Sequence, residues 1–121
     1  MLTGVRVLIV EDEPLIALDL RSTFEDAGAN VVCASSVDHA IRSIEADAVD
    51  LCVLDTQLWQ GETSHSISGL LRDRSVPFAL FSAYSAQHVG ALAHLTKPVP
   101  SDAVIRVAEA FLVARGSSNP Q

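Results

Sequence analysis

Five polar side chains follow apolar, strand-like stretches of the chain. Glu11 and Asp12 come after the first stretch, and Asp55, Ser82 and Lys97 each come after a later one. Clustered carboxylates repel one another, and a hard divalent cation such as Mg²⁺ relieves this repulsion through oxygen ligands. A metal-bound carboxylate beside an ammonium group can attack a phosphoryl group, because the two cations neutralise its equatorial oxygens. Together the five side chains therefore predict phosphoryl transfer to a carboxylate.

Each of these residues also has a simpler interpretation when it is taken alone. An acidic pair before a helix, such as Glu11 and Asp12, interacts favourably with the helix dipole. Asp55 alone could form a turn, Ser82 could hydrogen-bond to the backbone, and Lys97 could be a solvated surface residue. The chemical interpretation therefore depends on the elements that bring these residues together.

Strand and helix patterns alternate five times along the chain. Short apolar, β-branched stretches predict buried strands, at residues 5–10, 31–34, 51–54, 77–81 and 94–96. Helical patterns follow the strands, and the pattern at 84–92 is short and weak. This alternation predicts a parallel sheet with helices on both faces, whose ligands bind outside the carboxyl ends of the strands. All five polar residues are expected at that edge.

Two of the predicted helices carry specific expectations. The first should run from Pro14 to about Gly28, with an apolar face formed by Leu15, Ile16, Leu18, Leu20 and Phe24. Residues 62–74 form a poor helix by propensity, because serines and a glycine interrupt the segment.

The composition indicates one globular domain. The chain has 121 residues, of which 49% are hydrophobic and 19% are charged. Its net charge of −7 disfavours nucleic acid and anionic membranes as partners. No apolar run approaches the roughly 18–20 residues of a membrane-spanning helix, and no signal-peptide pattern is present, so we expect a cytoplasmic protein. The domain should cover residues 1–116, followed by a disordered tail at 117–121.

The two cysteines are expected to be structural. Cys33 and Cys52 each lie within an apolar stretch, without a CxxC pattern or a cysteine–histidine spacing suited to zinc. We therefore expect two buried, reduced thiols that pack as small hydrophobic groups.

The site residues and their neighbours resemble a known family. Four segments carry the resemblance, in this order: Val10-Glu11-Asp12-Glu13-Pro14, Leu54-Asp55, Ser82-Ala83 and Lys97-Pro98. They are similar to the receiver domain of two-component response regulators, the CheY-like family, over about residues 5 to 115. The resemblance implies a flavodoxin-like, doubly wound (βα)5 fold with a five-stranded parallel sheet of order 2-1-3-4-5. The fourth helix should be short or irregular, because Ser82 and Lys97 are closer in sequence than in most receivers.

The resemblance also implies a Mg²⁺ site at this edge of the sheet. Asp12 would bind the ion directly, and Glu11 would act mainly through a water molecule. Asp55 and the backbone carbonyl of Gln57 would supply further oxygen ligands.

In the same family, the residue at the position of Asp55 is the phosphoacceptor. Lys97 would pair with the phosphoryl group, and Ser82 would be the hydroxyl that reaches for its oxygens. The partner implied is a sensor histidine kinase, which donates the group from a phosphohistidine.

Parts of the sequence depart from the common receiver pattern. His94 stands where most receivers carry an aromatic residue that moves inward upon phosphorylation. Two segments resemble an atypical, mainly alphaproteobacterial subfamily of single-domain receivers with a Phe-Ala-Thr-Gly-Tyr-like motif: the Leu-x-x-Gly-Glu-Thr-Ser stretch at residues 58–64 and residues 77–84. In that motif Ser82 replaces threonine and Ala83 replaces glycine. Members of this subfamily commonly partner histidine kinases of the HWE or a related class.

Three functions are compatible with this set of residues. The first is a stand-alone phosphoacceptor, a monomer or weak dimer that serves as a phosphate sink, relay intermediate or protein-binding switch. The second is a pseudo-receiver that binds partners without carrying phosphate, which the intact set of Asp12, Asp55, Ser82 and Lys97 disfavours. The third is a phosphatase-like enzyme acting on outside substrates. It is disfavoured because Gln57 stands where such enzymes carry a second aspartate, so we do not expect an enzyme.

Overall fold

The structure is a computed structural model that describes six parts of the chain: residues 2–46, 48–55, 65–82, 93–96, 105–106 and 108–110. For Asp55, Ser82 and residues 93–96 the description covers the backbone and not the side chain. Gln57, Lys97, the expected helix at 84–92 and the expected tail lie outside the described residues.

Five parallel strands form one sheet, in the order β2-β1-β3-β4-β5. The strands are β1 (Arg6–Val10), β2 (Asn30–Ala34), β3 (Leu51–Asp55), β4 (Phe78–Ser82) and β5 (Ala93–Thr96). Each neighbouring pair is parallel. The predicted parallel sheet is confirmed, and the strand order agrees with the order that the family resemblance implies.

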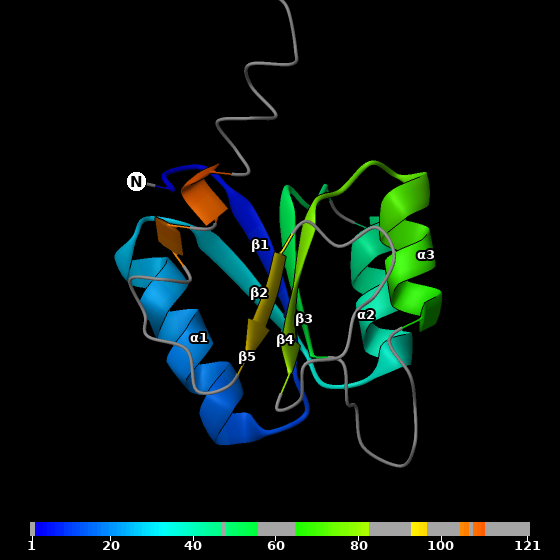
Figure 1. Ribbon diagram of the computed structural model, residues 1–121, viewed down its shortest axis with the longest axis horizontal. Coiled ribbons are helices and arrows are strands. Elements are labelled where there is room, and N and C mark those ends of the chain that lie inside the picture. The colour runs from blue at the N-terminus through cyan, green and yellow to red at the C-terminus, as the bar shows by residue number, and fades with distance from the viewer. Residues whose placement is uncertain are drawn as a thin grey trace, which may run out of the picture.

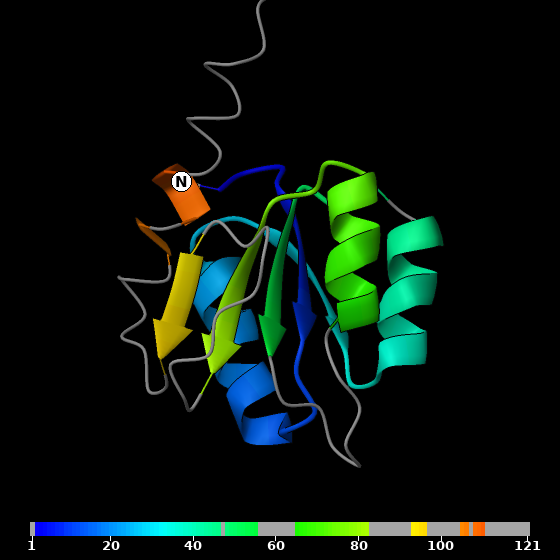
Figure 2. The same cartoon turned by 45° about the vertical axis from the view of Figure 1, so that its right-hand side comes forward.

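Helices lie on both faces of this sheet (Figure 1). Helix α1 (Pro14–Asp26) covers one face, and α2 (Val37–Ala46) and α3 (His65–Asp73) cover the other. Residues 105–106 and 108–110 are also helical. Figure 1 shows them near the carboxyl end of α1, and Ile105 and Ala108 pack in the core cluster of Phe24. Figure 2 shows the same arrangement after a rotation of 45°. The result is the three-layer arrangement that alternating strand and helix patterns predict.

Strand β1 is buried on both faces from Val7 to Val10, which explains the apolar sequence of these four residues, whereas Arg6 at its start is exposed. Val7 and Ile9 pack with Phe24 of α1 in one core cluster. Leu8 and Val10 point to the opposite face and join the cluster beneath α2 and α3. Successive side chains of a strand alternate between the faces of a sheet, so a strand covered on both faces has no position for a polar residue.

The buried face of α1 is narrower than the predicted apolar face. Leu20 and Phe24 are buried and Ile16 packs against the core, but the side chains of Leu15 and Leu18 are 75% and 60% exposed. Residues 16, 20 and 24 are spaced by four and share one stripe of the helix, whereas positions 15 and 18 lie to the side of it. The prediction that Leu15 and Leu18 face inward was therefore wrong.

The helix termini follow their local sequence signals. Pro14 begins α1, and Gly28 follows its end with a φ of +98°. A Cβ at Gly28 would lie 2.9 Å from the Thr3 hydroxyl oxygen, so only glycine fits this turn. Ser36 caps α2, because its hydroxyl accepts a hydrogen bond from the His39 amide at 3.2 Å.

Helix α3 forms despite its weak propensity because one of its faces is buried. Ile67 and Leu71 are fully buried in the cluster that also contains Ala40 and Ile44 of α2. Tertiary packing of an apolar face contributes more to a helix in a folded protein than intrinsic propensity does. Residues 62–64 of the predicted helix lie outside the described part of the chain.

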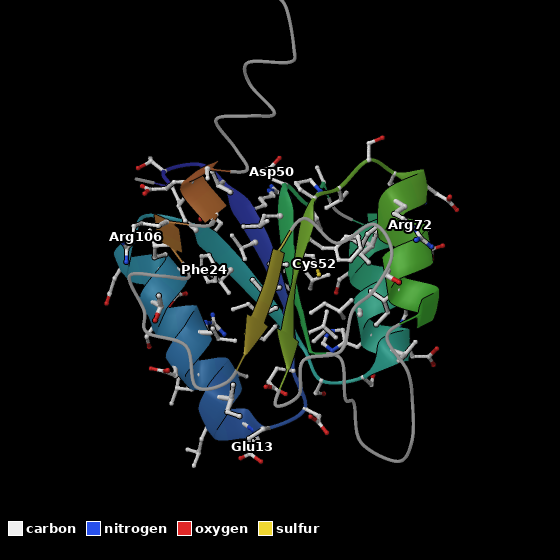
Figure 3. All side chains as sticks on the ribbon, viewed as in Figure 1. Glu13, Phe24, Asp50, Cys52, Arg72 and Arg106 are labelled. Atoms are coloured by element: carbon white, nitrogen blue, oxygen red, sulfur yellow. The ribbon has the colours of Figure 1, made fainter. Side chains whose placement is uncertain are left out.

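Both cysteines are free thiols, as predicted. Cys52 lies in the core between the sheet and the α2–α3 layer (Figure 3), and its burial raises the pKa of the thiol. Cys33 is only half-buried, so the prediction of full burial fails at this position. Partial burial still raises the pKa of the Cys33 thiol, and nearby Arg21 partly offsets this effect. Elevated pKa values keep both groups in the unreactive thiol form at neutral pH.

No helix in the described part of the chain is both long and apolar enough to span a bilayer.

Truncation of Phe24 tests the core between α1 and the sheet. Its side chain is fully buried and points from α1 toward the strands (Figure 3). Phe24→Ala should lower the free energy of unfolding by about 3–5 kcal/mol, because it removes buried apolar surface and leaves a cavity. Urea denaturation measures this change. The exposed Leu15 supplies the control, since Leu15→Ala should alter stability by no more than about 0.5 kcal/mol. Equal losses in the two variants would contradict this description of the core.

Candidate functional site

The carboxyl ends of the strands meet at one edge of the sheet. The register aligns Val10 of β1 with Leu54 of β3, so Glu11 and Asp55 occupy equivalent positions one residue further along the two strands. In Figure 2 the strand arrowheads all point to this edge. Hydrogen-bonded strands lie about 4.8 Å apart, so the backbones that carry the two acidic positions are close neighbours.

The same edge also carries Ser82. Asp55 is aligned with Phe81 of β4, and Ser82 is aligned with Thr96 of β5. Asp55 and Ser82 are each the last residue of a strand rather than the first residue after it. The structure therefore brings the backbones of Asp55 and Ser82 to the edge where Glu11 lies.

Glu11 is buried and hydrogen-bonded to its own loop. Its side chain is 3% exposed. Its Oε2 accepts hydrogen bonds from the backbone amide of Asp12 at 3.0 Å and from that of Glu13 at 3.4 Å. The Glu11 amide itself donates to the carbonyl of Ala34 at the end of β2, at 3.0 Å. Glu11 thus fixes the backbone of the loop between β1 and α1 through its side chain, and links this loop to β2 through its amide.

The two acidic residues that follow are progressively more exposed. Asp12 is half-buried and Glu13 is exposed. Figure 3 shows Glu13 at the end of the sheet where α1 begins, and Asp50 at the opposite end. Three consecutive carboxylates thus occupy three different environments. Asp12 is the intermediate case, partly covered by the protein and partly accessible to solvent.

These donors suit a hard cation. Glu11 and Asp12 provide carboxylate oxygens, the ligand type that Mg²⁺ prefers, and β3 ends in a third acidic residue, Asp55. Among the residues whose side chains are described, no group of three histidine, cysteine or acidic side chains is arranged to hold a metal. The Asp55 side chain and the Gln57 carbonyl, two of the predicted ligands, lie outside that set, as does the predicted phosphoryl partner Lys97.

Comparison with known proteins identifies the family. The family model described as "Response regulator receiver domain" matches residues 7–109. The chain belongs to this family. As a receiver domain, it is part of two-component signalling, and the resemblance inferred from the strand-end residues is confirmed at the level of the family.

Curated relatives of this receiver domain are longer proteins. It is 36% identical over 81 residues to the phyllosphere-induced regulator PhyR of Methylorubrum extorquens, covering 64% of this chain and 30% of PhyR. It is 30% identical over 106 residues to the alginate biosynthesis transcriptional regulatory protein AlgB of Pseudomonas aeruginosa, covering 80% of this chain and 23% of AlgB. The receiver domain therefore spans less than a third of the length of these relatives.

Solved structures share the fold of this receiver domain. A CheY-like receiver domain from Methanospirillum hungatei aligns with a TM-score of 0.87 at 20% identity, covering 95% of this chain and 98% of that one. The response regulator TrrA from Thermotoga maritima, solved in complex with Mg²⁺ and a beryllium fluoride, aligns with a TM-score of 0.78 at 22% identity, covering 88% and 97% of the two chains. These alignments show a common flavodoxin-like architecture.

Sequence reasoning did not foresee the hydrogen bonds of Glu11. The expected role was contact with the metal through water, whereas the structure turns Oε2 toward the amides of Asp12 and Glu13. One signal was present in the sequence. The third residue of α1 is Ile16, which cannot supply the carboxylate of a capping box, so another acceptor was needed at the start of this helix.

Loss of the Asp12 charge should weaken magnesium binding. Mg²⁺ that binds the folded receiver would raise its melting temperature by mass action, by the equivalent of about 2.7 kcal/mol at a hundred times the Kd. Asp12→Asn should abolish most of this shift, because a neutral amide replaces a charged ligand. Thermal melts with and without MgCl₂ measure the effect. The control is Asp26→Asn, which alters an exposed residue at the far end of α1 and should preserve the shift. An unchanged shift in Asp12→Asn would overturn the site.

Proposed function

We propose that this receiver domain accepts a phosphoryl group on Asp55 from the phosphohistidine of a sensor histidine kinase, in a Mg²⁺-dependent reaction. The observation that carries the proposal is the register of the sheet. It puts Asp55 at the end of a central strand, beside the β1 end that leads to Glu11 and Asp12, while the adjoining β4 ends in Ser82. A nucleophilic carboxylate, metal ligands and a hydroxyl from separate strands are the parts that phosphoryl transfer requires.

The transfer exchanges one bond to phosphorus for another. A carboxylate oxygen of Asp55 attacks the phosphorus atom, and the bond between phosphorus and the imidazole nitrogen of the kinase breaks. The electron pair stays on that nitrogen, and Asp55 becomes an acyl phosphate. Bound Mg²⁺ would neutralise the charge of the phosphoryl oxygens. Lys97 would pair with those oxygens, and the Ser82 hydroxyl would donate a hydrogen bond to them. Attack by water then returns the carboxylate and releases phosphate.

The proposed protein is a signalling phosphoacceptor and not an enzyme for outside substrates. It catalyses only its own phosphorylation and dephosphorylation. Its output would be that of a phosphate sink, a relay intermediate or a protein-binding switch, acting in the cytoplasm as a monomer or weak dimer. A pseudo-receiver that never carries phosphate is the alternative, and the experiment with Asp55 below distinguishes the two.

The subfamily and the kinase class belong to the same proposal. We assign the chain to the atypical single-domain receivers of alphaproteobacteria, on the basis of the sequences at residues 58–64 and 77–84. The 36% identity to PhyR supports the sequence resemblance within the receiver domain and not the single-domain state, because the match covers 30% of PhyR. The expected partner is accordingly a histidine kinase of the HWE or a related class.

Replacement of Asp55 tests the phosphoacceptor directly. Asp55→Asn preserves size but removes the attacking charge, so transfer of radiolabel from a phosphorylated histidine kinase should vanish while the circular dichroism spectrum persists. Asp50→Asn is the matched control, because Asp50 immediately precedes the same strand at its opposite end. This control should retain labelling.

The chemical stability of any remaining label shows which group carries it. Base-labile label on Asp55→Asn would mean that another carboxylate is the acceptor, and acid-stable label would point to a hydroxyl such as Ser82. An unlabelled wild-type protein, tested with several kinases, would favour the pseudo-receiver.

Phosphorylation should act mainly on the segment between β4 and β5. His94 is aligned with Leu80 in the β4–β5 pair. An imidazole is polar and titrates near neutral pH, so an inward movement of His94 would gain little hydrophobic free energy. We expect the largest gain in amide protection at residues 83–96 when beryllofluoride mimics the phosphoryl group, measured by hydrogen exchange. His94→Ala should retain most of that gain. Identical exchange in the two states, or loss of the effect in His94→Ala, would contradict this mechanism.

A further inference from the structure

The start of α1 lacks the usual devices that satisfy a helix N-terminus. Its N-cap residue, Glu13, makes no side-chain capping hydrogen bond, and the first turn contains no acidic residue. Pro14 at the first helical position has no amide proton to be satisfied. In a capping box the third helical residue would accept a hydrogen bond from the N-cap amide, but in α1 that residue is Ile16.

Glu11, the residue after β1, supplies the hydrogen-bond acceptor for the N-cap amide of α1. Its Oε2 accepts the amide of the N-cap residue Glu13 at 3.4 Å and the amide of Asp12 at 3.0 Å. Because the positive end of the helix dipole lies here, a carboxylate is a favourable acceptor. Among the carboxylates whose side chains the structure describes, Glu11 is the one that is buried, and hydrogen bonds to charged acceptors compensate for burial.

These contacts constrain the backbone on both sides of Asp12. The Glu11 amide is bound to the Ala34 carbonyl of β2, the Glu11 side chain holds the next two amides, and the Glu13 carbonyl accepts the amide of Ala17 at 3.0 Å. Asp12 thus lies between a strand end and a helix start that are both anchored. The backbone that carries the half-buried Asp12 side chain is therefore constrained on both sides.

We propose that Glu11 is a positioning residue for Asp12, and that it supports magnesium binding as a hydrogen-bond acceptor rather than through its charge near the metal. This inference rests on the magnesium site of the proposed function and deepens it. Groups that orient a metal ligand typically contribute about 10–100-fold to metal affinity. The hydrogen bonds to the loop amides involve only atoms of the protein, so amide exchange can follow them separately from magnesium binding.

Two substitutions separate the contribution of the Glu11 hydrogen-bond acceptor to magnesium affinity from the contribution of the Glu11 charge. Glu11→Gln removes the charge but retains a side-chain oxygen at the same distance from the backbone. Glu11→Met retains the length of the side chain and removes the oxygen acceptor. Magnesium affinity, measured by isothermal titration calorimetry, should fall by less than about threefold in Glu11→Gln and by at least about tenfold in Glu11→Met.

Glu13 provides the matched control. It lies two residues away and carries the same charge, but it is exposed. Glu13→Gln should change the magnesium affinity by less than about twofold, because surface charges are screened by solvent and salt.

Hydrogen exchange of the metal-free protein supplies a readout that is independent of magnesium. The amides of Asp12 and Glu13 should be protected in the wild type and in Glu11→Gln, and should exchange at least about tenfold faster in Glu11→Met. Should Glu11→Met fail to fold, the affinity of Glu11→Gln and the protection in the wild type and Glu11→Gln decide the question.

The results separate this inference from the function on which it rests. Similar losses of affinity in Glu11→Gln and Glu11→Met would show that the charge matters, and would overturn the positioning role while leaving the magnesium site intact. Wild-type affinity in Glu11→Met, or unprotected Asp12 and Glu13 amides in the wild type, would also overturn it. Absence of magnesium binding in the wild type would instead reject the proposed magnesium site, and the positioning role with it.

Discussion

The burial of β1 between two helical layers is the constraint on which the rest of the structure depends. This strand is paired on both edges, with β2 and with β3, and its residues from Val7 to Val10 are buried. A strand held on all four sides cannot slip, because a shift of one residue would exchange the side chains of its two faces. The position of Val10 is therefore fixed, and with it the point at which the acidic loop begins.

The loop after β1 serves the fold and the chemistry together. Glu11 satisfies backbone amides at the start of α1, a helix whose own N-cap side chain does not. Asp12, the next residue, is half-buried at the edge where the strands end. A substitution in this loop thus affects both the helix start and the expected metal ligand. Variants here need a stability measurement beside every binding measurement, since a weaker helix start and a lost ligand can both reduce affinity.

Membership in the receiver family and the register of the sheet support each other. The family model covers residues 7–109, and the sheet independently aligns the ends of β1, β3 and β4, where Glu11, Asp55 and Ser82 lie. The finer function depends on what distinguishes this chain from other receivers. His94 at the edge strand and the sequence after Asp55 are the main differences, and they concern how a phosphoryl group would change the surface rather than whether the carboxylate can accept one.

The sequence by itself determined the alternation of strands and helices, the parallel sheet and the strand ends at which polar residues accumulate. Apolar stretches such as Val7–Val10 are long enough, and contain enough β-branched residues, to predict buried strands without tertiary information. Only the tertiary structure decided which side chains at the margins are covered. Leu15 and Leu18 are apolar but exposed, because they lie beside the stripe of α1 that packs on the core, and Cys33 is half-buried in β2, the strand at the edge of the sheet. The hydrogen bonds of Glu11 were likewise decided by tertiary structure, since the direction of a carboxylate depends on where the turn after β1 presents its amides.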